Sequence, residues 1–215
     1  MRPFAPTLLT MSALPNRDRR AERREATRRE IVDAAWAVAR EGGLTAVTLR
    51  AVAERVGMRS PSLYTHFESK NAIYDAMFGD AWSQYLAVVE SIQQTLPKAP
   101  RKAVLTMVTT FTEFALADLV RFQLMNQRVV ADFAPTEASY APSVRVIKLF
   151  GQNLARFGVT RQEDVDLCVA IVGGLVDAQF ANDPGGARWT RLLPRAMDIF
   201  ADDVGLPGPK LRRSR

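Results

Sequence analysis

Small polar side chains and one phenol are concentrated between residues 60 and 65 of this 215-residue chain. The residues that can face outward from a helix there are Ser60, Pro61, Ser62, Tyr64 and Thr65. Small polar side chains permit close approach to a DNA groove, and their hydroxyls can bond both phosphates and base edges. The chemistry that this run offers is therefore recognition of a nucleic acid, provided that one helix presents it to the solvent.

Two short helices are predicted to position this run. Thr48 can cap a helix that extends to Val56 and ends at Gly57. Ser60 followed by Pro61 predicts a second helix over residues 61–67, with Ser60 as its cap. The apolar residues that face inward from this pair are Leu49, Val52, Val56, Leu63 and Phe67. The pair has the dimensions of a helix-turn-helix, a motif that many helical proteins contain without touching DNA.

The remaining periodic segments are also helical. Residues 19–41 form a helix that stops at Gly42 and Gly43, and its buried face carries Ile31, Ala34, Ala35 and Val38. Ser69 can cap a long connecting helix toward Leu96. Further helices are expected over residues 101–118, 119–131, 137–157, 162–182 and 187–203, the fourth starting from a capping box at residues 160–163.

These segments predict an all-α protein with no sustained period-two alternation. Residues 1–18 are interpreted as a flexible leader and residues 204–215 as a basic flexible tail. Residues 19–69 would form a three-helix DNA-binding domain, and residues 70–203 a larger helical domain for dimerisation and effector binding.

The distribution of charge supports a basic N-terminal unit on a mildly acidic body. Residues 1–70 hold 13 Lys or Arg against 8 Asp or Glu, whereas residues 71–203 hold 12 against 15. A basic module on an acidic body is typical of a polyanion-binding protein, although basic ends also occur on proteins that bind no nucleic acid.

Several classes of protein are disfavoured. The single cysteine, Cys168, cannot form an internal disulfide, and charges break every apolar run before it reaches membrane-spanning length, so we expect a cytoplasmic protein without a membrane partner. One histidine and one cysteine exclude a clustered His/Cys metal site, and neither Gly173-Gly174 nor Gly185-Gly186 follows a strand as a phosphate loop would. We expect no catalytic residue, metal or cofactor, but a small-molecule carrier or an enzyme remains the alternative class.

Residues 24–80 resemble the N-terminal domain of the TetR-type (TetR/AcrR) transcriptional regulators. The resemblance rests on Ile-Val-Asp-Ala-Ala at residues 31–35, the Gly42-Gly43 stop, Thr-Leu-Arg-Ala-Val-Ala at 48–53, Gly57-Met58, and above all Leu-Tyr-Thr-His-Phe-Glu-Ser-Lys at 63–70. It implies a repressor that binds a near-palindromic operator of double-stranded DNA as a homodimer and is released by a small-molecule effector. It also implies phosphate contacts from Thr48, Tyr64, His66 and Lys70, and positions at or near base edges for Arg50, Ser60, Pro61 and Ser62. Nothing in the residues excludes an activator.

Two positions depart from the family pattern. The family commonly has Ser where this chain has Arg59, so we expect Ser60 to take over the cap and Arg59 to add a groove or phosphate contact. Ala39 stands where the family tends to have a bulky aromatic residue, and Trp36 could fill the space.

The larger domain offers candidates for an effector site and a dimer interface, and for both the alternative is an ordinary core. The resemblance implies an effector cavity, for which the candidates are Trp82, Tyr85, Met107, Phe111, Phe114, Phe122, Met125 and Phe150, with a polar minority of Glu113, Gln127, Arg128, Gln152 and Asn153. Their apolar majority favours a hydrophobic or amphipathic ligand. Two apolar stripes favour a four-helix interface with a second copy, through Cys168, Val172, Leu175, Val176, Gln179, Trp189, Leu192, Leu193 and Phe200. Gly173 and Gly174 within a helix would each cost about 1 kcal/mol relative to Ala, which close helix approach would explain.

Overall fold

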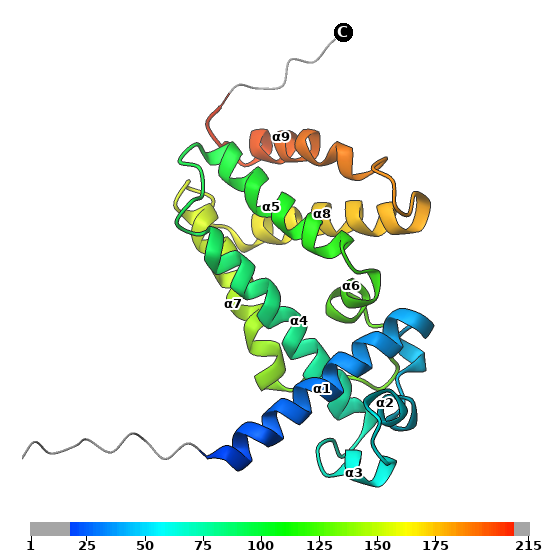
Figure 1. Ribbon diagram of the computed structural model, residues 1–215. Coiled ribbons are helices and arrows are strands. Elements are labelled where there is room, and N and C mark those ends of the chain that lie inside the picture. Colours follow the sequence, from blue (N-terminus) through cyan, green and yellow to red (C-terminus); the bar gives the residue numbers. More distant parts are fainter. Residues whose placement is uncertain (1–17, 209–215) are drawn as a thin grey trace, which may run out of the picture.

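The computed structural model describes residues 18–208, and every regular element in this range is helical (Figure 1). The predicted all-α class is confirmed. The elements are α1 (Arg19–Gly42), η1 (Leu44–Ala46), α2 (Leu49–Val56), α3 (Ser60–Tyr64), α4 (Lys70–Ile92), α5 (Pro100–Leu116), α6 (Leu119–Asn126), α7 (Glu137–Ala155), α8 (Gln162–Asn182), η2 (Thr190–Leu192) and α9 (Leu193–Asp203). Most of the expected leader and the end of the expected tail, residues 1–17 and 209–215, lie outside the described residues.

Local signals in the sequence set several helix ends as predicted. The Thr48 hydroxyl accepts a hydrogen bond from the backbone N–H of Ala51 at 3.0 Å and caps α2. The Ser69 hydroxyl does the same for α4, from the N–H of Ala72 at 3.1 Å. Gly57 ends α2 in the left-handed conformation, at φ 79°, which a residue with a Cβ rarely adopts.

Other helix boundaries differ from the prediction. Ser60 is not the cap of α3 but its first residue, Arg59 is the cap residue without a side-chain bond, and α3 ends at Tyr64 instead of 67. Arg161, not Thr160, precedes α8, so the predicted capping box is absent. Helices α4, α6 and α7 end earlier than predicted, at residues 92, 126 and 155.

The last predicted helix, over residues 187–203, is replaced by η2 followed by α9. The buried side chain of Gln179 holds the start of this segment in place. Its carbonyl oxygen accepts hydrogen bonds from the backbone N–H groups of Trp189 and Thr190, at 2.9 and 3.3 Å. The Asp183 carboxylate accepts from the N–H of Arg188 at 2.8 Å. These side chains take up N–H groups at the start of the segment, and the α-helix proper begins only at Leu193.

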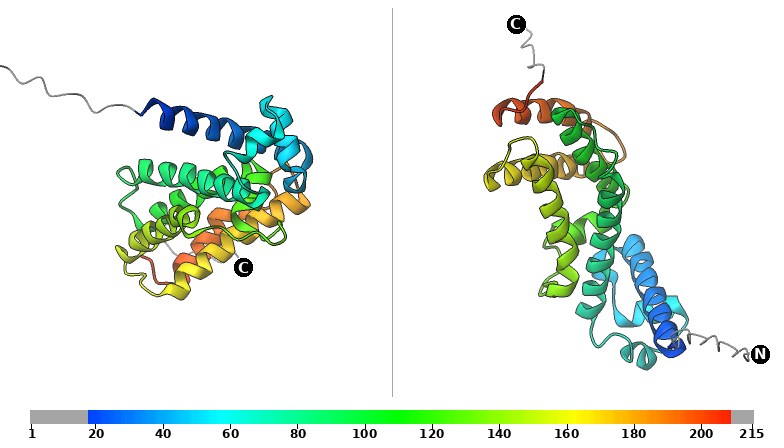
Figure 2. Two further views of the ribbon diagram at one scale, coloured as in Figure 1. Left: turned by 90° about the horizontal axis from the view of Figure 1, so that it is seen from below. Right: turned by 90° about the vertical axis from the view of Figure 1, so that its left-hand side faces the viewer.

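Helices α1, α2 and α3 form a three-helix unit at one end of an elongated molecule, and α8 and α9 lie side by side at the other end (Figures 1 and 2). The pair α4 and α7 connects the two ends. With 23 residues, α4 is about 35 Å long. Its N-terminal half packs into the same core as Ile31, Leu63 and Phe67 of the three-helix unit. Helix α4 is therefore packed directly against that unit.

A second core lies between α5, the C-terminal end of α7, α8 and α9. Its fully buried members include Leu154, Cys168 and Phe200. Within residues 18–208, no single helix is long and apolar enough to cross a membrane. Helices α5 and α6 meet that test only as a pair, and they are bent by 115° at the break between them.

Candidate nucleic-acid interface and ligand cavity

Helices α2 and α3 bury one side and expose the other. Val52, Ala53, Leu63 and Phe67 are buried beneath them. Seven of the nine predicted DNA-contacting residues are exposed, and Ser60 and His66 are half-buried. Tyr64 is 54% exposed, although it is a large aromatic residue. The nine residues are thus gathered at one end of the molecule, where α2 and α3 lie (Figure 1).

Three of the predicted contact residues already have intramolecular partners. The Thr48 hydroxyl accepts the capping bond, which leaves its proton available to a phosphate oxygen. Arg50 Nε donates to Glu54 at 3.1 Å, a pair so exposed that little is lost when it breaks. The Lys70 ammonium lies 5.6 Å from the centroid of the Tyr74 ring. None of these partners prevents contact with DNA.

Arg28 holds the turn between α3 and α4 against α1, a role that the sequence did not reveal. Its Nη1 donates a hydrogen bond to the backbone carbonyl of His66. Its guanidinium carbon lies 4.1 Å from the centroid of the Phe67 ring. The only signal was its place on the inward side of α1, one turn before Ile31. Arg28 is therefore a positioning residue for the exposed face of α3.

The three-helix unit is attached to α4 by two further polar contacts. The Tyr74 hydroxyl donates to the carbonyl of Leu44, and burial raises the pKa of that phenol. The indole Nε1 of Trp36 donates to Asp80 at 3.3 Å. Both Trp36 and Ala39, the two residues around the departure from the family pattern, are buried.

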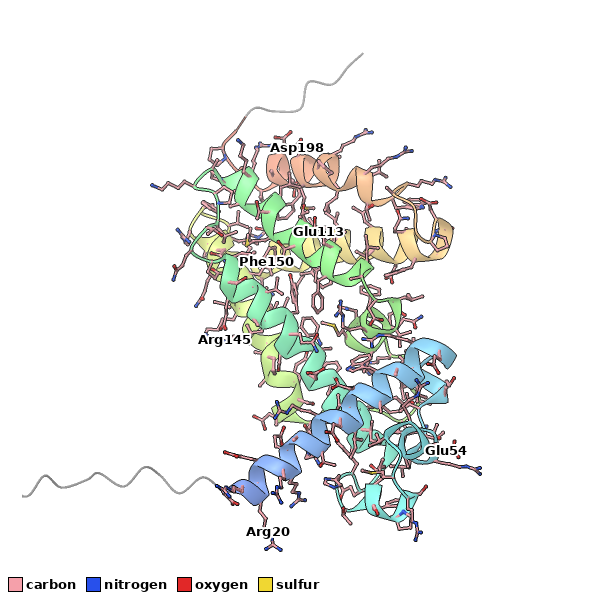
Figure 3. All side chains as sticks on the ribbon, in the orientation of Figure 1. Arg20, Glu54, Glu113, Arg145, Phe150 and Asp198 are labelled. Carbon is pink, nitrogen blue, oxygen red and sulfur yellow. The ribbon has the colours of Figure 1, made fainter. Side chains whose placement is uncertain are left out.

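A cavity of about 100 Å³ lies between α4, α5, α7 and α8. Five of the eight predicted effector residues line it, namely Trp82, Tyr85, Met107, Phe111 and Phe150. Figure 3 shows Phe150 on α7, in the middle of the larger domain. Of the predicted polar minority only Asn153 is among the lining residues. Ile147 and Val169, which are 39% and 45% exposed, mark where the cavity meets the surface.

The other three predicted effector residues do not line the cavity. Phe114 packs against the ring of Tyr85, with ring centroids 5.0 Å apart. Phe122 is buried beside Val176, and Met125 belongs to the core around α4. Aromatic residues at helical spacing thus include both cavity walls and ordinary core.

The chemistry of the cavity is neutral. None of its lining residues is charged. At its polar end the Asn153 amide donates to the Gln93 carbonyl oxygen at 3.0 Å. The buried indole N–H of Trp82 has no acceptor within residues 18–208. Burial raises the pKa of the Cys168 thiol to about 12, so the group is protonated at neutral pH. Such a site suits an uncharged, largely apolar molecule that carries a hydrogen-bond acceptor.

A chain of contacts leads from this cavity to the three-helix unit. The Tyr85 ring, in the cavity wall, packs against Phe114, and the guanidinium of Arg121 lies 3.7 Å from the Phe114 ring centroid. Asp118 accepts the backbone N–H of Arg121 at 3.0 Å. The same carboxylate accepts Arg40 Nε of α1 at 2.8 Å. The α5–α6 turn therefore touches both the cavity wall and the end of α1.

Most of the predicted dimer residues lie inside the chain's own core. Six of the nine are buried, namely Cys168, Val172, Val176, Gln179, Leu193 and Phe200, and these cannot face a partner as expected. Cys168 and Val172 line the cavity instead. Trp189 and Leu175 are half-buried, and Leu192 is exposed. The apolar stripe assigned to the interface is the inner side of α8.

Another side of α8 is exposed and poor in large side chains. It consists of residues three or four apart, Leu167, Ala170, Gly174, Asp177 and Ala181, which we call the α8 stripe. A Cβ placed on Gly173 or Gly174 would meet no atom within 4 Å. Close packing within residues 18–208 therefore does not explain these glycines.

Residues 18–208 contain no group of three or more His, Cys, Asp or Glu side chains that could hold a metal ion.

Comparison with known proteins agrees with this geometry. Residues 31–77 match the sequence model of the family described as bacterial regulatory proteins, tetR family. A protein of unknown function from Rhodococcus sp. RHA1 has a TM-score of 0.71 to this chain at 17% identity, over 84% of this chain and 95% of that one. A TetR family transcription regulator from Marinobacter aquaeolei VT8 has a TM-score of 0.61 at 15% identity, over 85% of this chain and 97% of that one. The transcriptional regulator FadR from Bacillus subtilis, in complex with stearoyl-CoA, has a TM-score of 0.60 at 14% identity, over 80% of this chain and 96% of that one.

Identities this low establish a shared fold and nothing finer. The family match is more specific, because it covers the α2–turn–α3 segment and the start of α4, where the exposed polar residues lie. This match points to a regulatory protein rather than an enzyme. Residues 31–77 therefore match the tetR family of bacterial regulatory proteins, and the chain shares its fold with solved structures that include a TetR family transcription regulator.

Proposed function

We propose that this protein is a cytoplasmic repressor that binds a near-palindromic operator as a homodimer and is released by a small, uncharged, largely apolar effector. The observation that carries the proposal is the exposed polar face of α3 and its surroundings, set on a core shared with α4. Because α4 also carries Trp82 and Tyr85 of the cavity wall, one rigid helix belongs to both sites.

DNA binding would divide the polar face into two groups. Thr48, Tyr64, His66 and Lys70 hold phosphates, and Arg50, Ser60, Pro61 and Ser62 lie at or near base edges, with Arg59 as an additional contact. Phosphate contacts set the position on the duplex, and base contacts select the sequence. Two copies would place two α3 helices about 34 Å apart, or a multiple of that distance, on a two-fold symmetric operator.

The second copy is proposed to pack on the α8 stripe. Ala170, Gly174 and Ala181 are small, so they would allow the backbones of two α8 helices to approach closely. The open space above Gly173 and Gly174 supports this arrangement. The exposed side chain of Ile199 on α9, which is 53% exposed, would add apolar area to the same interface.

Effector binding would act by shifting a population of conformations. The cavity of about 100 Å³ is smaller than the roughly 150 Å³ that holds benzene in an engineered protein core, so a larger ligand must part its walls. Displacement of Tyr85 and Phe114 would reach Arg40 through Asp118, and displacement of α4 would reach α3 directly. A ligand that prefers the widened cavity then favours dimers whose α3 spacing no longer fits the operator.

Selection of bound duplexes from a random-sequence pool tests the proposal, followed by mobility shift with the DNA around the gene itself. We expect a near-palindromic sequence to be enriched. A double variant, Tyr64→Ala with Lys70→Ala, should enrich nothing, because it removes two of the proposed DNA contacts. Both side chains are exposed, so their loss should leave the fold intact. The double variant Gln84→Ala with Lys98→Ala, also exposed but far from α3, is the control. A folded dimer that enriches no sequence would contradict the proposal and favour a carrier or an enzyme.

The effector is tested separately on the selected operator. Neutral apolar compounds that carry one acceptor should raise the melting temperature and release the DNA, whereas their carboxylate analogues should do neither. Release by the charged analogues alone would contradict the proposed ligand class.

A further inference from the structure

We propose that α1 carries a second DNA-contacting surface, formed by Arg20 and Arg24, that binds the phosphate backbone beside the segment occupied by α3. The inference rests on the proposed function, since it concerns the DNA that flanks the site bound by α3. It adds a contact that neither the family match nor the helix-turn-helix geometry assigns.

The position of these arginines follows from the spacing along α1. Arg20, Arg24 and Arg28 are four residues apart and therefore lie on one face of the helix. Arg28 shows where that face points, because it contacts the carbonyl of His66 and the ring of Phe67 at the α3–α4 turn. The row of arginines thus begins at the end of α3 and continues along α1 beyond the packed core.

Both outer arginines are open to solvent. Residues 18–25 are all exposed, so the first turns of α1 project from the three-helix unit. No acid within residues 18–208 forms an ion pair with Arg20 or Arg24. Glu22 and Glu25 emerge from other sides of the helix, because successive residues are turned by about 100°. Neither arginine has an acidic residue three or four positions away on α1; the nearby Asp18 carboxylate caps the helix by accepting the backbone N–H of Arg20 at 3.1 Å.

The direction of the row also fits a duplex bound at α3. Figure 3 shows Arg20 pointing away from the larger domain, toward the end of the molecule at which α3 lies. Helix α3 itself contains no Lys or Arg, so charge neutralisation of the backbone depends on residues around it. Guanidinium groups bind phosphate in bidentate fashion, which suits Arg for this task.

The length of the row sets the size of the added footprint. Eight residues separate Arg20 from Arg28, which is about 12 Å along the helix. Duplex DNA advances by about 3.4 Å for each base pair, so the row covers about three to four base pairs beyond α3. Because the contacts are to phosphates, the sequence of these flanking base pairs should not matter.

The test compares two duplexes that contain the same selected operator, one ending at its edges and one extended by four base pairs on each side. Wild-type protein should bind the extended duplex at least about tenfold more tightly at low salt. The double variant Arg20→Gln with Arg24→Gln should lose that gain and keep the wild-type affinity for the short duplex. Its log-log salt slope on the extended duplex should be shallower by about 3.6, for four lost contacts per dimer at about 0.9 each.

A charge-matched control separates a defined surface from general attraction. Arg19→Gln with Arg29→Gln removes the same charge from α1, but both residues point away from the row, and it should keep the gain from the extension. Equal losses in the two double variants would overturn the inference, as would wild-type protein that binds both duplexes equally well. Those results would leave the proposed function standing. Wild-type protein that binds neither duplex would overturn the proposed function and this inference with it.

Discussion

Arg40 Nε lies 2.8 Å from Asp118 Oδ2, which ties the last turns of α1 to the turn between α5 and α6. The two partners differ in their surroundings, because the Asp118 side chain is 10% exposed and that of Arg40 is 52% exposed. Asp118 also caps α6 by accepting the backbone N–H of Arg121. One carboxylate thus has both a local and a long-range role.

Substitutions at this pair should separate the two roles. Asp118→Ala removes the cap and the ion pair, and we expect it to lower the free energy of unfolding by about 1–2 kcal/mol. Asp118→Asn keeps a good capping side chain, so it should cost less than about 1 kcal/mol, as should Arg40→Ala. Denaturant unfolding at fixed protein concentration measures all three. An Asp118→Ala variant no less stable than Arg40→Ala would argue against the capping role.

Cys168 should report on the cavity, because it is the only cysteine and lies in the wall. Its reaction with a small neutral disulfide reagent should be slow at pH 8 and should rise with pH toward about 12, the pKa that burial gives the thiol. A dianionic reagent should react far more slowly still, because the cavity lining holds no positive charge. A neutral ligand should protect the thiol. Rapid labelling by the dianion at pH 8 is incompatible with this site.

The same thiol should contribute to the dependence of stability on pH. Its pKa is higher in the folded state than the roughly 8.5 of an unfolded chain. The contribution is therefore fully present below about pH 8.5 and is lost as the pH rises toward 12. Alkaline unfolding curves of wild-type protein and Cys168→Ala should converge over that range. If the stabilities of the two proteins instead changed in parallel with pH, the raised pKa of the Cys168 thiol would be contradicted.

Gln179 is expected to be a stability determinant, not an interface residue. Gln179→Leu would leave the N–H groups of Trp189 and Thr190 without their acceptor, and should cost about 1–3 kcal/mol. The exposed Gln152 on α7 provides the control, because Gln152→Leu should change the unfolding free energy by less than about 0.5 kcal/mol. Equal effects at both positions would show that the buried amide is dispensable.

The affinity for DNA should depend steeply on salt. On the extended duplex, about four cationic side chains per protomer, such as Lys70, Arg59, Arg20 and Arg24, would each neutralise one phosphate. The log-log slope for the dimer is then near −7, and a slope near −2 would contradict about eight cationic contacts per dimer. Lys70→Ala should weaken binding to operator and unrelated DNA alike, whereas Ser62→Ala should change the preferred sequence. Fluorescence anisotropy at several salt concentrations distinguishes these outcomes.

Gly174 offers a direct test of the second copy. In the Gly174→Gln variant the new side chain would point into open space in a single chain. The substitution should therefore not lower the melting temperature of a monomer. In a dimer packed on the α8 stripe it would separate the helices, so light scattering should show a monomer. Ala155→Gln, on the exposed side of α7, should leave the dimer intact. A Gly174→Gln protein that still dimerises would place the interface elsewhere.

The sequence by itself determined the all-helical class and the helix-turn-helix, because the signals for both are local. A hydroxyl at residue 48 or 69 bonds to a backbone N–H three residues later, and Gly57 allows a left-handed turn wherever the rest of the chain lies. The exposed side of α3 followed from the four-residue spacing of Leu63 and Phe67, which are both buried. Some boundaries were predicted wrongly: α4 and α6 end at residues 92 and 126 instead of 96 and 131, and the last α-helix starts at Leu193 instead of residue 187.

Only the tertiary structure decided which side of each apolar helix faces inward. Helix α8 carries apolar residues around most of its circumference, so periodicity could not tell Val172 and Val176, which are buried, from Leu167 and Val169, which are exposed. The contact between Arg28 and Phe67 joins residues 39 positions apart, and nothing local to either residue specifies it. Helix periodicity encodes that a face is apolar. The neighbour that covers it is set by the packing of the whole chain.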